Sequence, residues 1–379
     1  MMKLPVIPLL MVAVALPASC AAPTVQPTVS AGPCRFTIAF LGALTGENAN
    51  IGRGPRDGAK LAVDQYNATR PECPVDLSEL DTAGDAERAA VRAQEAVADT
   101  RVLAIVGPSF SGEAEAAIPF LDQGGVTVIT PSATRTSLAE QGWRVFHRVT
   151  GNDAAQGPAA GQYLKRMVSA RNVYVVNDLG AYGKGLADEV RKELGPLVIG
   201  NADVQQGQFD YRRLAAIVAA SGADAVFYGG YYAEAGQLLK ALRDAGSTAA
   251  FVTGDGARDP GLIEHAGAHA AEGAVITCQC LPPERARDGF LQRFQEHFGT
   301  YPGNYAAESY DAAQILLSGI QAGNKTRASL LAYVDAYDGD GITGHLKFDT
   351  RGELPVEAVK IWAYRVRDGR IVPDREITG

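Results

Sequence analysis

VLAIVGPSFSGEAEAA, residues 102–117, joins an apolar run to an alanine-rich stretch through a turn that contains two serines. The run Val102–Val106 has the length and composition of a buried strand, and the stretch after the turn, Glu113–Gln123, has the composition of a helix. A strand, a tight turn and a helix in this order indicate one unit of an α/β protein. A turn of this kind can present a nucleophilic serine, bind a phosphate or bind a carboxylate. Other parts of the sequence distinguish these three possibilities.

The same strand–helix unit repeats along both halves of the chain. In the first half, strands are expected at 36–41, 75–80, 102–106, 126–130 and 146–150, with helices at 54–66, 85–99, 113–123 and 137–141. The second half has expected strands at 172–176, 197–199, 225–228, 250–252 and 273–277, with helices at 156–169, 183–194, 212–221 and 233–245. Helices at 286–298, 304–322 and 327–337 and a pair of strands, His345–Asp349 and Ala358–Val366, close the chain.

This alternation predicts parallel sheets that are covered by helices on both faces. We therefore expect an α/β fold with two Rossmann-like lobes. Because helices follow the second half, the chain must cross between the lobes several times, which predicts a hinge of several crossovers. The expected N-terminal lobe comprises residues 35–150 and 281–350, and the expected C-terminal lobe comprises 151–280 and 351–379. Ligands bind beyond the carboxyl ends of such strands, so loops of both lobes are expected to line one cleft.

The N-terminus has the pattern of an export signal. Lys3 precedes the apolar stretch Leu4–Leu16, which is shorter than the ~20 residues that a membrane span requires. We interpret residues 1–20 as a signal peptide and residues 21–34 as a tether rich in Pro, Thr, Ser and Ala. Cys20 follows Leu-Pro-Ala-Ser and resembles the cysteine of a bacterial lipobox, although Pro17 stands where leucine is usual. Lipidation of Cys20, and hence a lipid anchor in the membrane, is expected; ordinary cleavage at the next alanines is the alternative.

Charge and cysteine content narrow the remaining possibilities. The net charge of −8 is spread without long runs, so we expect no nucleic-acid partner. Four cysteines remain beside Cys20, an even number for an oxidising compartment. Cys34 and Cys73 each precede a strand of the first half, and a disulfide between them is expected if the two strands are neighbours. Cys278 and Cys280 lie two residues apart on one strand, where a bridge and two free thiols both remain open.

Patterns typical of enzymes do not match the strand-end loops. Residues 107–112, GPSFSG, lack the spacing of the Gly-x-Ser-x-Gly nucleophile turn, and nothing in the sequence brings a base near Ser109 or Ser111. The stretches 180–185 and 42–46 fit neither the P-loop nor the dinucleotide-binding pattern. No acidic or histidine cluster has the spacing of metal ligands. We therefore expect neither enzymatic activity nor a cofactor or metal.

Two adjacent strand-end loops instead favour a carboxylate. Ser109 and Ser111 stand at the start of a helix, whose free amides attract anions, and Ser132 and Thr134 follow the next strand. A role as helix N-caps is the alternative for these hydroxyls. In the second half, Asp255 lies in a glycine turn that is expected to face them, although Asp-Gly is also a common turn sequence. A carboxylate site opposite an acidic side chain describes a free amino acid.

Seven stretches taken together resemble the periplasmic leucine/isoleucine/valine-binding proteins that feed ABC transporters, which have the type I periplasmic-binding fold. The resemblance covers essentially the whole mature chain. The matching stretches are 40–46, 107–111, 130–134, 157–160, 182–186, 228–232 and 271–273.

The resemblance implies a set of ligand contacts. Ser111 and Thr134 would hold the ligand carboxylate, with a backbone contact at Ser132, and Asp255 would hold the ammonium where the family often has glutamate. Tyr182 and Tyr231 would contribute from the second lobe. Around the ligand side chain, the resemblance places Phe110, Tyr305 and Glu47 or Arg53, with Ile51 where several relatives have an aromatic residue.

The resemblance therefore implies that this is an extracytoplasmic protein, periplasmic or at the cell surface. It is expected to capture a small amino acid between two lobes for an ABC importer. Its expected partners are that amino acid, the permease and, through the lipid anchor, the membrane, and the protein is expected to be a monomer. An amine-free carboxylate as ligand, such as an aromatic acid, and a role as a ligand sensor are the alternatives.

Overall fold

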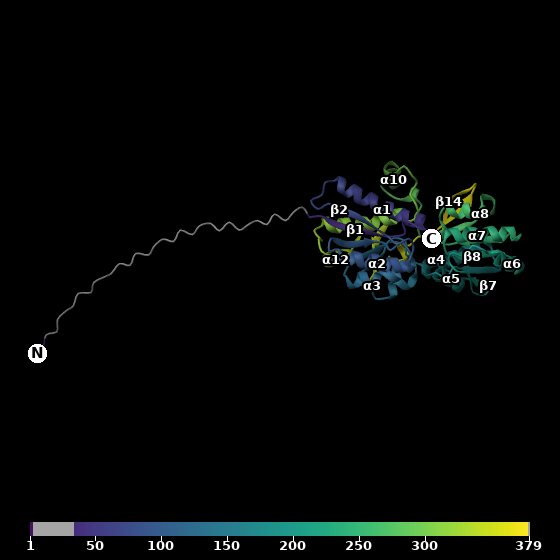
Figure 1. Cartoon of the computed structure of the whole chain (residues 1–379), viewed down its shortest axis with the longest axis horizontal. Helices are drawn as coiled ribbons and strands as arrows, with labels where there is room; N and C mark the ends of the chain where they lie inside the picture. The colour runs from purple at the N-terminus through teal and green to yellow at the C-terminus, as the bar shows by residue number, and fades with distance from the viewer. Residues whose placement is uncertain (3–33, 378–379) are drawn as a thin grey trace. The chain divides into compact units, whose positions relative to one another are not determined.

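The computed structural model describes residues 1–2 and 34–377 (Figure 1). The predicted signal peptide from Lys3 onward, the predicted tether up to Pro33 and the predicted lipidation site Cys20 lie outside the described residues. Within the described part of the chain, no helix has both the length and the apolar character needed to cross a membrane.

The first sheet has five parallel strands in the order β2-β1-β3-β4-β5. These strands are β1 (Phe36–Gly42), β2 (Val75–Asp81), β3 (Val102–Val106), β4 (Thr127–Thr130) and β5 (Phe146–Arg148). Alternate side chains of β1 enter two different cores, because Ile38 and Phe40 point to one face and Ala39 and Leu41 to the other. Both faces are therefore covered, as the sequence predicts.

Helices from distant parts of the chain cover the first sheet. One face carries α1 (Ala49–Ala68), α10 (Phe290–Phe298), α11 (Ala306–Gln321) and α12 (Arg327–Asp335). The other face carries α2 (Ala86–Ala98) and α3 (Ser111–Gln123). In Figure 1, α1 lies above β1, and α2 and α3 lie below it.

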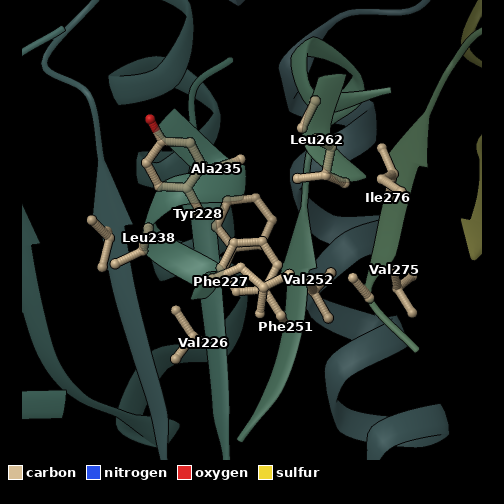
Figure 2. Packing of buried hydrophobic residues seen from close by; sticks show 14 of the residues in the cluster. Val226, Phe227, Tyr228, Ala235, Leu238, Phe251, Val252, Leu262, Val275 and Ile276 are labelled. Atoms are coloured by element: carbon tan, nitrogen blue, oxygen red, sulfur yellow. The ribbon is translucent and has the colours of Figure 1, made fainter. Parts of the chain in front are cut away.

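The second sheet has seven strands in the order β14-β13-β10-β9-β8-β6-β7. Its parallel strands are β6 (Val173–Asn177), β7 (Val198–Asp203), β8 (Ala225–Gly229), β9 (Ala250–Thr253) and β10 (Val275–Cys278), and its antiparallel strands are β13 (Trp362–Arg367) and β14 (Arg370–Glu376). Its helices are α4 (Asp153–Tyr163), α5 (Ala181–Leu194), α6 (Arg212–Ala220), α7 (Tyr232–Asp244), α8 (Gly261–Ala266) and α9 (Ala268–Ala271). Figure 2 shows side chains of β8, β9 and β10 packed with Leu238 of α7 and Leu262 of α8.

The chain passes three times between elements of the two sheets. It leaves the first sheet between β5 and α4, returns between β10 and α10, and leaves again before β13. These passages lie where the sequence places the crossovers of the hinge. The residue limits of the two lobes, 35–150 with 281–350 and 151–280 with 351–379, stay a prediction.

One predicted strand pairing is wrong. The strand near His345 is β12 (His345–Lys347), and it pairs with β11 (Asp338–Asp340) in a separate small sheet. The strand near Ala358 begins only at Trp362 and pairs with β14 across the turn Asp368-Gly369. Both turn residues have positive φ, 50° and 70°, which is the geometry that Asp-Gly favours in tight hairpins. β12 and β13 each form a hairpin with a strand close by in the sequence, because such a hairpin closes only a short loop. The two predicted strands therefore do not pair with each other.

Both cysteine pairs form disulfides. Cys34 and Cys73 lie at the same edge of the neighbouring strands β1 and β2, with Cα atoms 4.9 Å apart, which confirms the expected bridge. Cys278 and Cys280 are also bridged, at the end of β10, with Cα atoms 5.1 Å apart, which decides between the two open possibilities. The described residues bring one trio of potential metal ligands together, Cys34, Glu72 and Cys73, and its two thiols are joined in the disulfide.

Candidate ligand-binding site

A cavity lies among the strand-end loops of the two sheets. The space among these loops that protein atoms leave empty, open solvent included, is about 250 Å³. Its lining residues are Ile51, Ser109, Phe110, Ser111, Ser132, Tyr182, Tyr231, Asp255, Gly256 and Tyr305. Of the predicted ligand contacts, Thr134, Glu47 and Arg53 are not among them, and all the others are. Residues that are far apart in sequence therefore converge on one site, as the position beyond the strand ends predicts.

The two hydroxyl loops lie side by side because β3 and β4 are adjacent parallel strands. Helix α3 begins at Ser111 and its N-cap position is Phe110, so neither serine of the first loop is the N-cap. The Ser111 hydroxyl accepts the amide of Arg135 at 3.2 Å, and the Ser132 hydroxyl donates to the carbonyl of Ser109 at 2.9 Å. The first amides of α3 have no intrahelical partners, so this end of the cavity is suited to an anion.

Buried groups behind α3 hold this anion end in place. Glu113 accepts the amide of Phe110 at 3.2 Å and the hydroxyl of Thr82, and burial raises the pKa of Glu113 to about 8. The end of β1 passes close to the loop at Ser109. A Cβ atom at Gly42 would lie 2.2 Å from the Ser109 hydroxyl oxygen, so only glycine fits there.

Asp255 follows β9 of the second sheet, lines the same cavity and is 4% exposed. One carboxylate oxygen accepts the hydroxyl of Tyr182 at 2.8 Å, and the other accepts the hydroxyl of Tyr305 at 2.9 Å. Burial raises the pKa of Asp255, and these two hydrogen bonds oppose that rise. The flanking glycines allow the close packing, because a Cβ at Gly254 would lie 2.4 Å from the Tyr182 hydroxyl oxygen.

Three aromatic rings of the cavity lining lie next to one another. The Tyr231 ring lies 5.4 Å from the Phe110 ring and 5.3 Å from the Tyr182 ring, measured between centroids. Ile51 adds an aliphatic side chain from α1. The cavity lining thus combines polar groups with apolar side chains.

Glu47 and Arg53 lie elsewhere. Both side chains are exposed, and neither lines the cavity. Glu47 instead contributes its backbone carbonyl, which accepts the hydroxyl of Tyr232 from α7. This contact joins the two lobes, as does the hydrogen bond between Arg258 and the side chain of Asn304 at 2.8 Å.

Two further buried polar residues, Thr134 and Asp153, do not line the cavity. Thr134 is fully buried. Asp153 is 1% exposed, and the neighbouring Thr134 hydroxyl acts on its carboxylate as a hydrogen-bond donor that lowers its pKa. The Asp153 amide donates to the carbonyl of Thr134 at 2.8 Å, which holds the two residues together. Burial, and after it the charge of Asp255, raises the pKa of Asp153 to about 7.

Asp153 is a candidate residue that the sequence alone does not indicate. Asp153 is the first residue of α4, where an acidic side chain is ordinarily explained by the helix dipole. The available signal was its position at the passage from one lobe to the other, where strand-end loops of both lobes converge. Gln156, one turn further along α4, was missed for the same reason; it donates to the carbonyl of Thr277 at 2.7 Å.

The fold and the cavity between its strand-end loops are those of a two-lobed solute-binding protein. A family model described as periplasmic binding protein matches residues 35–370. The chain belongs to the periplasmic binding protein family, which confirms the family and the fold predicted from the sequence. This is a family of solute-binding proteins, and the expected lack of enzymatic activity stays a prediction.

Individual relatives agree with this assignment. The chain is 29% identical over 336 residues to an amino acid binding protein of Pseudomonas aeruginosa, covering 86% of this chain and 89% of the relative. It is 29% identical over 330 residues to the Leu/Ile/Val-binding protein of Escherichia coli K12, covering 84% and 87%. The branched-chain amino acid transporter substrate binding protein of Streptococcus pneumoniae, solved in complex with isoleucine, has a TM-score of 0.83 at 24% identity, covering 90% and 100%. The likeness to this solved structure shows the shared fold.

Proposed function

We propose that this protein captures a small α-amino acid in the cavity between its lobes and delivers it to the permease of an ABC importer. The observation that carries the proposal is a pair of buried carboxylates, Asp255 and Asp153, to which the described residues give no ion-pair partner. A buried carboxylate without a cation is costly for a folded protein. A ligand ammonium that enters the cavity supplies the missing positive charge.

The part of the cavity lined by Ser111 is suited to the ligand carboxylate. The free amides at the start of α3 and the hydroxyl of Ser111 offer donors there, and Ser132 lies beside them. The ligand side chain then faces the wall formed by Ile51, Phe110 and Tyr231. These apolar groups are close together, and the cavity is small, which favours a small side chain.

The names of the relatives support an amino acid as ligand, and the two acidic groups distinguish it from the alternative. An amine-free carboxylate, such as an aromatic acid, would leave Asp153 and Asp255 without a counter-charge in a closed cavity. The relatives that bind amino acids also support a location outside the cytoplasm. Lipid anchoring through Cys20 and a monomeric state belong to the same proposal.

A thermal-shift screen of the twenty amino acids and common organic acids tests the proposal directly. A ligand that binds only the folded state raises the apparent stability, by about 2.7 kcal/mol at a hundredfold excess over its Kd. We expect a small amino acid to raise the Tm and its amine-free analogue to leave it unchanged. A Tm rise with organic acids alone would overturn the amino-acid assignment. Isothermal titration calorimetry of the best ligand then gives the stoichiometry and Kd.

A further inference from the structure

The second disulfide lies where the chain passes from the second sheet back to the helices of the first. Cys278 is the last residue of β10 and is bridged to Cys280, and both residues are completely buried. A bridge that closes so short a loop removes much less freedom from the unfolded chain than the Cys34–Cys73 bridge, which spans 39 residues. Its effect is therefore expected in the geometry of this passage rather than in the stability of the whole protein.

The disulfide loop contacts elements of both sheets. From β13 of the second sheet, Tyr364 donates its hydroxyl to the carbonyl of Cys280 at 3.0 Å. From the helix layer of the first sheet, Asn304 stands in the turn before α11, and its side-chain oxygen lies 3.6 Å from the sulfur of Cys278. In a close-packed interior, the bridge thus limits where the Asn304 side chain can lie.

Asn304 connects this contact to the ligand cavity. Its side-chain amide donates to the backbone carbonyl of Asp255 at 3.1 Å, and its side-chain oxygen accepts the guanidinium of Arg258 at 2.8 Å. Asp255 and Arg258 follow β9, whereas Asn304 precedes α11, so both hydrogen bonds join the two lobes. The next residue, Tyr305, lines the cavity and donates its hydroxyl to Asp255 at 2.9 Å.

These contacts form a closed cycle. The Arg258 guanidinium lies over the aromatic ring of Tyr364, 4.2 Å from its centroid. Tyr364 in turn donates to Cys280. Arg258 also donates to Asn304, which meets the sulfur of Cys278. The disulfide is the covalent link that completes the cycle, and without it the two ends of the cycle are free to separate.

The turn before α11 needs such support. Tyr305 has a φ of 57°, a backbone conformation that residues with a side chain seldom adopt. On its other side the turn lies against α1, because a Cβ atom at Gly54 would lie 2.3 Å from the carbonyl oxygen of Asn304. The turn is therefore held between α1 and the disulfide loop, and the loss of one support lets it relax.

We propose that the Cys278–Cys280 bridge is a positioning element of the ligand site, which acts by fixing the side chain of Asn304. With Asn304 in place, Tyr305 and Asp255 stay aligned in the cavity and the lobes stay joined around a bound ligand. The inference rests on the proposed function, since its main measure is the affinity for the ligand. The two cysteines and Asn304 do not line the cavity, so they are positioning residues. A site that is already ordered loses less conformational freedom on binding, and this raises its affinity.

Loss of the bridge should weaken binding without unfolding the protein. We expect Cys278→Ser with Cys280→Ser to raise the Kd about tenfold, which is the effect of losing one or two neutral hydrogen bonds. Because the lobes then separate more readily, most of this change should lie in faster dissociation. Cys34→Ser with Cys73→Ser is the matched control. This pair of changes, at the edge of β1 and β2, should lower the stability and leave the Kd within about twofold.

The control variant also reports on the bridge with every side chain of the site unchanged. It keeps Cys278–Cys280 as the only disulfide within residues 34–377. Refolding in dithiothreitol converts this bridge into two thiols, while the reductant is oxidised to its cyclic disulfide. The reduced form should bind about tenfold more weakly than the oxidised form, and reoxidation should restore the affinity. Calorimetry measures the Kd, and stopped-flow fluorescence measures the dissociation rate.

Asn304→Ala tests whether the bridge acts through Asn304. In the oxidised protein this variant should raise the Kd about tenfold or more, because it removes two hydrogen bonds between the lobes. Loss of the bridge should then add no further change, whereas two independent effects would add. Hydrogen exchange of residues 303–309 in the ligand-free protein tests the positioning without any ligand. The exchange should become faster when the bridge is lost.

The outcomes are distinct. An unchanged Kd in the folded Cys278→Ser, Cys280→Ser variant or in the reduced form overturns the proposal, as does unchanged hydrogen exchange. If neither form without the bridge folds, wild-type affinity of Asn304→Ala overturns it. Additive losses in the triple variant overturn the route through Asn304. If no amino acid binds while an amine-free acid does, the proposed function fails, and the same titrations with that acid still test the bridge.

Discussion

Replacement of Asp255 by alanine should abolish most of the affinity for an amino acid. In the proposed complex the Asp255 carboxylate meets the ligand ammonium in a buried site, where its two oxygens are already aligned by the hydroxyls of Tyr182 and Tyr305. Breaking one partner of a buried ion pair costs about 3–5 kcal/mol. Since each ~1.4 kcal/mol is a factor of ten, the Kd should rise between about a hundredfold and a few thousandfold.

Ser111→Ala gives the internal comparison, because it removes one hydrogen bond to the charged carboxylate end. Such a bond is worth about 1.5–3 kcal/mol, which predicts a smaller loss, from about tenfold to a hundredfold. Calorimetry at pH 8 with the best ligand of the screen measures both variants. Glu264→Gln is the charge-matched control for Asp255, and its exposed position predicts a change below about twofold. Wild-type affinity in a folded Asp255→Ala variant would refute the ammonium site and favour an amine-free ligand.

Three further predictions concern motion and stability. Small-angle scattering should show a smaller radius of gyration with saturating ligand, because the lobes close by a hinge at the crossovers; identical curves would indicate a preformed, immobile site. Removal of the Cys34–Cys73 bridge, which spans 39 residues, by Cys34→Ser with Cys73→Ser should lower the free energy of unfolding by about 4 kcal/mol in urea titrations, and no loss would show that the bridge adds nothing to stability. Asp153→Asn should stabilise the ligand-free protein at pH 8 by up to about 4 kcal/mol and leave its stability unchanged at pH 3. The reason is that the pKa of Asp153 rises from 3.8 to about 7 on folding, so that ionisation of Asp153 between these values favours the unfolded state. Equal stability of the variant and the wild type at pH 8 would contradict this cost of burying the carboxylate.

The sequence predicts the order of the elements because each strand and helix carries its own local pattern. The alternation of buried runs and amphipathic stretches placed every parallel strand of both sheets. Pairing between distant strands is harder to predict, since a strand can pair with any of several strands and its local sequence does not specify which. The last strands show this, because the turn Asp368-Gly369 closes a hairpin that the apolar pattern of β13 alone does not reveal. The short helices α8 and α9 also escaped notice, as they are too brief for a clear helical period.

The candidate site could be predicted where residues lie in strand-end loops with a recognisable pattern. Ser111, Ser132 and Asp255 belong to such loops, and the structure brings them to one cavity. Tyr305 stands just before α11, far along the chain, and reaches Asp255 through a hydrogen bond that no local pattern indicates. Only the resemblance placed it near the ligand. Glu47 and Arg53 were placed by the same reasoning, and their side chains point to the surface instead.

Asp153 shows why a local rule can hide a candidate functional residue. An aspartate in the first turn of a helix usually stabilises that helix through the dipole, and this explanation is complete as long as the side chain is exposed. At 1% exposure the explanation fails, because the loss of solvation outweighs an effect of about 1 kcal/mol. Burial is a property of the assembled fold and not of the stretch that contains the residue. A buried acid without a cation destabilises the empty protein, and the same free energy becomes available when a cationic group enters. We therefore expect that the variants which most improve the stability of the ligand-free protein, Asp153→Asn and Asp255→Asn, are also those that bind the ligand least well.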